Sequence, residues 1–200
     1  MNAIPAPTDP LRTPRLWIRR VTLSDAPFFL ALLNSPGWLR FIGDRNVHTL
    51  EEAADYIRNR ILPGYTRPGY GSFLVGPLGS NDPVGFVGVF ERESLSSPDF
   101  GFAFLPAWQG AGYAFEASQG LLQLPEIQAL PALLAIALPD NVRSIRLLRK
   151  LGFVEDGTAE SGRIPIPCYA SGVRKLKSPP PKRERRSKAF SSKGSITVVP

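Results

Sequence analysis

With 200 residues, of which 43% are hydrophobic and 10% aromatic, the chain is long enough for one globular domain with a sizeable core. Its single cysteine, Cys168, excludes an internal disulfide, and neither a secretory signal nor a bilayer-spanning run is visible, so we expect a cytoplasmic protein without membrane contact. The net charge of +7 is confined to one end, because residues 174–200 hold nine Lys or Arg and one acid and residues 1–173 sum to −1.

The N-terminal part begins with residues 1–14, which are rich in Pro and Ala and predict a disordered leader. Residues 15–21 alternate in the manner of a strand. We expect Ser24 to cap a helix over residues 25–33, and the pair Pro36-Gly37 to end it.

A second helix follows, because Thr49 and Glu52 form a capping box, and we expect it to run to about Ile61. Residues 72–76 and 84–91 predict two strands of a hairpin around a turn rich in Gly, Asn, Asp and Pro.

The centre of the chain holds an apolar strand over residues 100–105, a turn with two glycines, and a helix over residues 113–124 that Pro125 stops. Such an arrangement offers free backbone N–H groups and a helix dipole to an anion, best a phosphate or pyrophosphate. A tight packing turn without a ligand is the alternative. A dinucleotide-binding fold is disfavoured, because the third glycine and a strand-ending acid are missing.

The last elements are an uninterrupted apolar strand over residues 132–138 and a helix over residues 141–151. The element order predicts an α/β fold, a mixed sheet with helices on both faces, over residues 15–173. Residues 163–170 contain two prolines, Pro165 and Pro167, each of which would remove a hydrogen-bond donor from a strand ladder. Residues 174–200 predict a basic disordered tail.

Two blocks of this sequence resemble the GNAT superfamily of acetyl-CoA-dependent N-acetyltransferases. The stretch Gln109-Gly110-Ala111-Gly112-Tyr113-Ala114 is similar to its Q/R-x-x-G-x-G/A signature, and residues 140–153 are similar to its second conserved block. Residues 15–19 and 99–102 resemble the branch of ribosomal-protein N-terminal acetyltransferases. The resemblance implies the GNAT fold, a mostly antiparallel sheet of six to seven strands. It also implies a final β-hairpin, and because of Pro165 and Pro167 we expect either an edge strand that starts near Cys168 or a degenerate hairpin.

The resemblance also implies where coenzyme A binds. Gln109 and the backbone N–H groups of the turn would hold the pyrophosphate, and the backbone of Phe104 and Leu105 would pair with the pantetheine arm. Asn141 would bind that arm from the start of the last helix, where it can also cap the helix, and Ser144 would lie near the sulfur. The implied cofactor-binding set is Phe104, Leu105, Gln109, Gly110, Ala111, Gly112, Tyr113, Ala114, Asn141 and Ser144.

For catalysis, the tyrosine that many family members carry as general acid is replaced here by Leu148, and Ser144 is the nearest substitute. The alternative for Ser144 is a hydroxyl bonded back to its own helix. Glu93 and Asp99, on the connection before the central strand, are the candidate general bases, and a solvated loop carboxylate is the alternative for each.

The predicted function is acetyl transfer from acetyl-CoA to a primary amine, either a protein N-terminus or a small molecule, by direct attack in a ternary complex and without a metal. A non-catalytic acyl-CoA-binding protein with a degenerate acceptor site is the alternative. The basic tail leaves a nuclear address or a nucleic-acid contact open, and the protein is expected to be a monomer or a homodimer.

Overall fold

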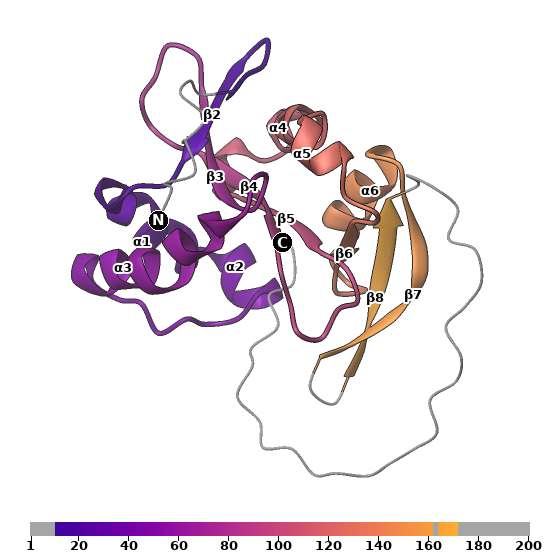
Figure 1. The fold of residues 1–200 in the computed structure, drawn as a ribbon. Helices are drawn as coiled ribbons and strands as arrows, with labels where there is room; N and C mark the ends of the chain where they lie inside the picture. The colour runs from indigo at the N-terminus through magenta and orange to yellow at the C-terminus, as the bar shows by residue number, and fades with distance from the viewer. Residues whose placement is uncertain (1–10, 162–163, 172–200) are drawn as a thin grey trace.

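The computed structural model describes residues 11–161 and 164–171. They form one mixed sheet of eight strands in the order β1-β2-β3-β4-β5-β6-β8-β7 (Figure 1). All neighbouring strands are antiparallel except the pair β5 and β6, which is parallel. The strands are β1 (Leu11–Arg12), β2 (Leu16–Arg20), β3 (Gly71–Pro77), β4 (Gly85–Phe90), β5 (Asp99–Phe104), β6 (Leu134–Ile136), β7 (Phe153–Ser161) and β8 (Ile164–Ser171).

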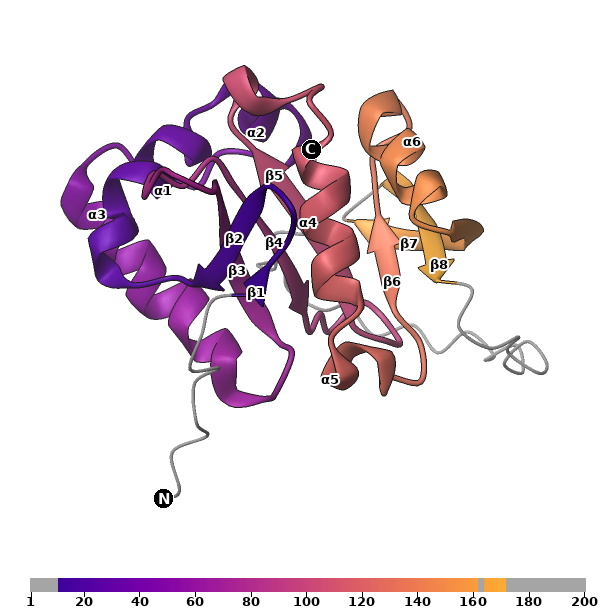
Figure 2. The same cartoon turned by 90° about the horizontal axis from the view of Figure 1, so that it is seen from above.

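Helices cover both faces of this sheet (Figure 2). One face packs on α4 (Tyr113–Leu122), α5 (Pro125–Gln128) and α6 (Val142–Lys150), and the other on α1 (Ala26–Leu33), α2 (Pro36–Phe41) and α3 (Leu50–Tyr56). Side chains of β5 alternate between the two layers: Phe100 and Phe102 enter the α4 side and Ala103 the α1 side. The mixed, mostly antiparallel α/β fold is therefore confirmed, with eight strands rather than six or seven.

The N-terminal segment departs from its prediction at both ends. Residues 11–14 were assigned to the leader, yet Leu11 pairs with Ile18 as part of β1, and residues 1–10 lie outside the described residues. The first helix does not begin at a Ser24 cap. Instead Asp25 accepts a hydrogen bond from the backbone N–H of Thr22 over 2.7 Å and pairs with Arg19 at the same distance.

The first helix ends at Leu33 as predicted, but Pro36-Gly37 does not act as the stop signal that was expected. Pro36 is the first residue of α2, and the Ser35 hydroxyl accepts a hydrogen bond from the backbone N–H of Trp38. Proline is favourable at this position because the first helical N–H has no partner inside the helix. The capping box of Thr49 and Glu52 is confirmed at the start of α3.

The prediction for the last strand is wrong, because β8 pairs with β6 on one side and with β7 on the other and is therefore neither an edge strand nor part of a degenerate hairpin. Pro167 points its carbonyl toward β6, where it accepts from the backbone N–H of Ala137 over 3.4 Å. Because residues two apart point the same way, the missing N–H groups of Pro165 and Pro167 both face β6 and not β7. β6 ends at Ile136, so the prolines remove little from the sheet. The tail over residues 174–200 lies outside the described residues.

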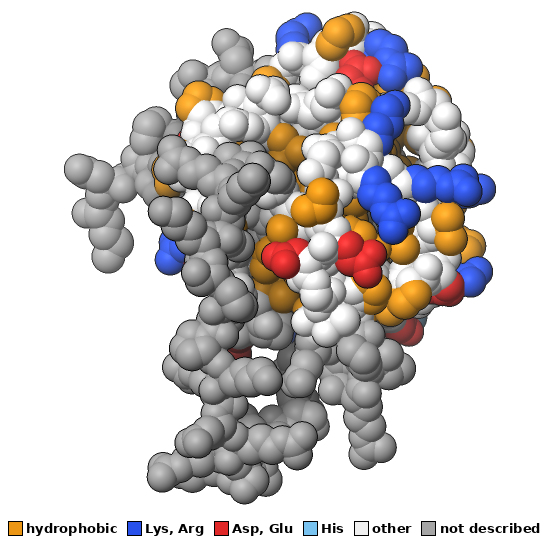
Figure 3. All heavy atoms as spheres, turned by 90° about the vertical axis from the view of Figure 1, so that its right-hand side faces the viewer, with side chains coloured by type: hydrophobic (Ala, Val, Ile, Leu, Met, Phe, Trp, Pro, Cys, Tyr) orange, Lys and Arg blue, Asp and Glu red, His pale blue; other side chains and the backbone are white. Residues whose placement is uncertain are grey.

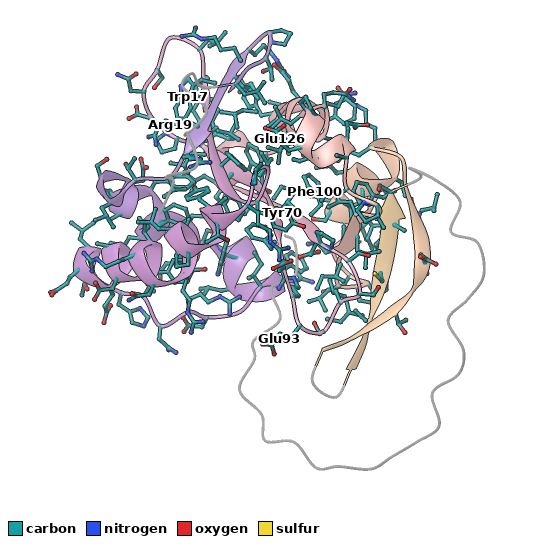
Figure 4. The ribbon with its side chains drawn as sticks, in the orientation of Figure 1. Trp17, Arg19, Tyr70, Glu93, Phe100 and Glu126 are labelled. Carbon is teal, nitrogen blue, oxygen red and sulfur yellow. The ribbon has the colours of Figure 1, made fainter. Side chains whose placement is uncertain are left out.

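Phe100 joins the two halves of the sheet. Its fully buried ring stacks on that of Phe153 in β7, with ring centroids 5.7 Å apart. Figure 4 places Phe100 in the interior, between β5 and the C-terminal strands.

We expect Phe100→Ala to lower the free energy of unfolding by about 3–5 kcal/mol, because it leaves a cavity and removes a stacked ring. Urea unfolding measures the change, and Phe90→Ala, at a half-buried ring on β4, serves as the milder comparison. Equal losses for the two variants would contradict the role given to Phe100.

Candidate active site

β5 and β6 separate almost as soon as they meet. A single ladder pair, Asp99 with Leu134, joins them within the described residues. The backbone N–H of Leu134 donates to the carbonyl of Pro98 over 2.8 Å, and beyond this point the strands diverge. The gap that results is bordered by strand edges whose backbone groups lack a ladder partner.

The register of β5 shows which of its backbone groups face this gap. The N–H of Leu105 donates to the carbonyl of Val84, which continues the ladder toward β4. Because backbone groups alternate in direction, those of Phe102 and Phe104 face β6 and the gap. Of the two predicted residues, Phe104 thus has backbone groups directed toward the gap, whereas the Leu105 N–H is directed toward β4. The Phe104 carbonyl accepts a hydrogen bond from the Gln109 amide over 2.9 Å.

The two-glycine turn follows β5 directly and leads into α4. Gly110 and Gly112 have φ angles of 86° and 82°, a left-handed conformation that favours glycine. A Cβ at Gly110 would meet no atom within 4 Å, and both residues are exposed. The N-terminus of α4 therefore opens to solvent with room for an anion.

The sequence matches the acetyltransferase (GNAT) domain family over residues 15–154. The chain belongs to this family. The resemblance drawn from the two sequence blocks is thereby confirmed.

Solved structures with the same fold include three GNAT-related proteins. An acetyltransferase (GNAT family) from Bacillus anthracis is 22% identical with a TM-score of 0.63, covering 80% of this chain and 95% of its own. An acetyltransferase from Agrobacterium tumefaciens is 19% identical with a TM-score of 0.66, and the match covers 85% of this chain and 98% of the other. RimL, a ribosomal L7/L12 α-N-protein acetyltransferase in complex with coenzyme A, is 19% identical with a TM-score of 0.67, and the match covers 81% of this chain and 97% of the other. No curated protein sequence matches the chain.

The start of α6 brings two predicted residues of this acetyltransferase together. Asn141 is buried, and its Oδ1 accepts a hydrogen bond from the backbone N–H of Ser144 over 3.2 Å, so it caps α6 as expected. The Ser144 hydroxyl is also buried, but within the described residues it has no hydrogen-bond partner. The alternative in which this hydroxyl bonds back to its own helix is therefore not observed.

The two candidate bases differ sharply in their surroundings. Glu93 is exposed, and Figure 4 shows it at the outer end of the loop between β4 and β5. Asp99 is fully buried where β5 and β6 separate, and its Oδ2 accepts from Arg92 Nε over 2.5 Å. Its other oxygen, Oδ1, makes no hydrogen bond of good geometry to the described part of the chain. Burial raises the pKa of Asp99 to about 6, against the opposing effect of Arg92.

Cys168 lies in β8 opposite Ile136, on the side of the sheet that Asp99 faces. Burial, and secondarily the charge of Asp99, raises the pKa of this thiol to about 11. Cys168 is therefore protonated at neutral pH and unsuited to act as a nucleophile.

Sequence reasoning missed Arg15, whose guanidinium braces the glycine turn. Its Nη1 donates to the carbonyl of Ala111 over 3.1 Å, and its Nε pairs with Glu116 in the first turn of α4 over 2.6 Å. The side chain also lies over the ring of Tyr113. Arg15 and Tyr113 are 98 positions apart in the sequence, so no local signal could have indicated this contact.

A second group of cations comes from α6. Arg143 donates to the side-chain oxygen of Gln109 over 3.3 Å, which places one cation directly at the turn. Figure 3, which views the side of α6 and β7, shows Lys and Arg side chains gathered in its upper part. The exposed cations of α6 are Arg143, Arg146, Arg149 and Lys150.

Neither a metal site nor a membrane-spanning helix is found in residues 11–161 and 164–171. No group of three or more His, Cys, Asp or Glu side chains is placed to hold a metal ion there. Within the same residues, none of the helices has the length and apolar character needed to cross a membrane.

We expect the free energy of unfolding of wild type, relative to that of Asp99→Asn, to rise as the pH falls. A paired surface carboxylate would give the opposite trend. Because the folded-state pKa is about 6, above the usual 3.8, the folded state takes up a proton first as the pH falls from 7 to 4. Wild type should gain up to about 3 kcal/mol relative to the variant over this range and lose it again as the pH rises through 6. Urea unfolding at several pH values tests this, and a constant or reversed difference would contradict it.

Proposed function

We propose that this acetyltransferase moves an acetyl group from acetyl-CoA, held in the gap between β5 and β6, to a primary amine. The observation that carries the proposal is the single ladder pair between these parallel strands, directly before a glycine turn at the start of α4. A strand edge that is followed directly by a helix N-terminus suits a ligand with amide groups at one end and phosphates at the other.

The turn would hold the pyrophosphate of coenzyme A. The backbone N–H groups of the stretch from Gly110 through Ala111 and Gly112 to Tyr113 and Ala114 lie at the positive end of the α4 dipole. Two cations support the same role, because Arg15 contacts the Ala111 carbonyl and Arg143 contacts Gln109. Gln109 would exchange one of its present contacts for a phosphate oxygen.

The pantetheine arm would extend along β5. The backbone groups of Phe102 and Phe104 face the gap and would supply ladder partners for the amides of the arm. Asn141 lies buried on the opposite side, at the first turn of α6. This arrangement brings the thioester toward the closed end of the gap, where Asp99 pairs with Leu134.

The thioester supplies an activated acetyl carbonyl, and the chain's own residues would manage two protons. The buried, unpartnered Ser144 hydroxyl would donate a hydrogen bond to the departing sulfur. For the attacking amine we favour Asp99 over Glu93, because Asp99 is buried where β5 and β6 separate and its pKa of about 6 keeps it ionised at neutral pH. The exposed Glu93 would act only through solvent.

The acceptor is a primary amine, either a protein N-terminus or a small molecule. Likeness to RimL supports testing a protein N-terminus, whose amine pKa of about 8 makes it easier to deprotonate than a lysine. The non-catalytic binder remains the second candidate because Leu148 occupies the place of the usual tyrosine. The intact β8 removes one reason for that alternative.

We expect acetyl-CoA at 100 times its dissociation constant to stabilise wild type by about 2.7 kcal/mol, and Gly110→Trp to abolish this stabilisation. The indole would fill the space that the pyrophosphate needs. Gly79→Trp is the matched control, because Gly79 is also exposed, has a φ of 90° and has no atom within 4 Å of an added Cβ. Thermal unfolding with and without the ligand measures both, and no stabilisation of wild type would contradict acetyl-CoA binding.

We expect Ser144→Ala to lower kcat for acetyl transfer by roughly 10- to 100-fold while leaving acetyl-CoA affinity within about threefold, because the hydroxyl acts on the departing sulfur. Ser118→Ala removes an equally buried, unpartnered hydroxyl from α4 and should leave kcat unchanged. Steady-state release of coenzyme A with an amine panel measures this. A drop of the same size in both variants would indicate a packing effect.

A further inference from the structure

The peptide group between Ala111 and Gly112 lies in the middle of the glycine turn and is held from one side. Arg15 Nη1 donates a hydrogen bond to the Ala111 carbonyl over 3.1 Å. The described residues contain no cis peptide bond, and in a trans peptide the C=O and the following N–H point in opposite directions. The N–H of Gly112 therefore points away from the Arg15 guanidinium.

The turn alone does not fix this orientation of the peptide group. Gly112 has a φ of 82°, and because glycine takes positive and negative φ about equally well, the peptide plane before it can turn over at little cost. Ala111 and Gly112 are both exposed, so packing around them does not select one orientation. In the opposite orientation the Ala111 carbonyl would take the direction of the present Gly112 N–H, and an anion would meet an acceptor where it needs a donor.

The Arg15 guanidinium is in turn held by α4. Its Nε pairs with Glu116 Oε2 over 2.6 Å, and the Arg15 backbone N–H donates to Oε1 over 2.8 Å. The Thr13 hydroxyl donates to the same Oε1 over 2.7 Å, and the guanidinium lies 4.7 Å from the centroid of the Tyr113 ring. Because Glu116 and Tyr113 both belong to α4, the helix that begins at the turn also fixes the arginine that orients the turn.

From these contacts, and resting on the proposed function, we infer that Arg15 is a positioning residue for the pyrophosphate of coenzyme A. It holds the Ala111 carbonyl so that the Gly112 N–H is presented to a phosphate oxygen. Arg15 directly precedes β2, and the sheet order places β2 and the gap on opposite sides of β4 and β5. An N–H that points away from Arg15 therefore suits a ligand in the gap. Glu116 acts through Arg15, because its carboxylate anchors the guanidinium.

The first test is calorimetric titration of the full-length protein with coenzyme A and with dephospho-coenzyme A, which keeps the pyrophosphate but lacks the 3′-phosphate. We expect Arg15→Gln to raise the Kd of both ligands by at least about tenfold, because one hydrogen bond to a charged oxygen is lost in each complex. Arg12→Gln is the matched control, because it removes the same charge from an exposed position of the same hairpin, and it should change Kd by less than about threefold.

The second test separates positioning from direct contact with the phosphate. In protein labelled with ¹⁵N-glycine, saturation with coenzyme A should move the Gly112 amide proton of wild type downfield, and this shift should be largely lost in saturated Arg15→Gln. The Gly112 signal is assigned by its absence from Gly112→Ala. Glu116→Gln, which keeps the guanidinium but weakens its anchor, should show both changes in reduced size, and it replaces Arg15→Gln if that variant does not fold.

The outcomes of the two tests are distinct. Equal Kd values for wild type and Arg15→Gln would overturn the inference. A tenfold loss of affinity with the Gly112 shift retained would also overturn it, because Arg15 would then contact the phosphate itself. A loss confined to coenzyme A, with dephospho-coenzyme A unaffected, would place Arg15 at the 3′-phosphate and overturn it as well. Failure of wild type to bind either ligand would instead overturn the proposed function.

Discussion

The separation of β5 from β6 is the feature on which the rest of this structure depends. An antiparallel ladder runs from β1 to β5 and again from β6 through β8 to β7, and among the residues that the structure describes a single ladder pair connects the two halves. On one face Phe100 stacks on Phe153 and holds the halves together by apolar contact. On the other face Asp99 and Arg92 occupy the junction as a buried ion pair. The gap is stable because both faces of its closed end are filled.

Burying an ion pair at this junction costs free energy. Desolvation of both charges offsets much of their attraction, and an apolar pair of similar volume would often be no less stable. The raised pKa of Asp99 is the signature of that cost. Perturbed carboxylates gather at functional sites because a base needs a pKa near the working pH. Stability alone therefore does not account for Asp99, whereas the role of general base that we propose for it would.

Local signals predicted most of the frame, and non-local contacts account for what they missed. The Gly110–Gly112 turn, the box of Thr49 and Glu52, and the Asn141 cap act within a few residues and were found. Two predictions from proline were wrong because the effect of proline depends on its position. Pro36 begins a helix. The sides of Pro165 and Pro167 that lack an N–H group face β6, which ends before it reaches them. Arg15 at the turn and Arg92 at the junction each depend on a partner that only the fold brings near.

Positive charge gathers at the gap although the net charge of the folded part of the sequence is close to zero. Residues 1–173 sum to −1, yet Arg15 and Arg143 stand at the glycine turn, and Arg92 stands at the closed end of the gap beside Asp99. Arg15 and Arg143 lie away from the place where the acetyl group would be transferred. Attraction at such remote points does not by itself lower the barrier, but it can hold two reactants in line and offset the entropy of bringing them together. The anionic pyrophosphate of coenzyme A, bound at the turn as we propose, would thus let the fold orient the acyl donor with few contacts at the reacting atoms themselves.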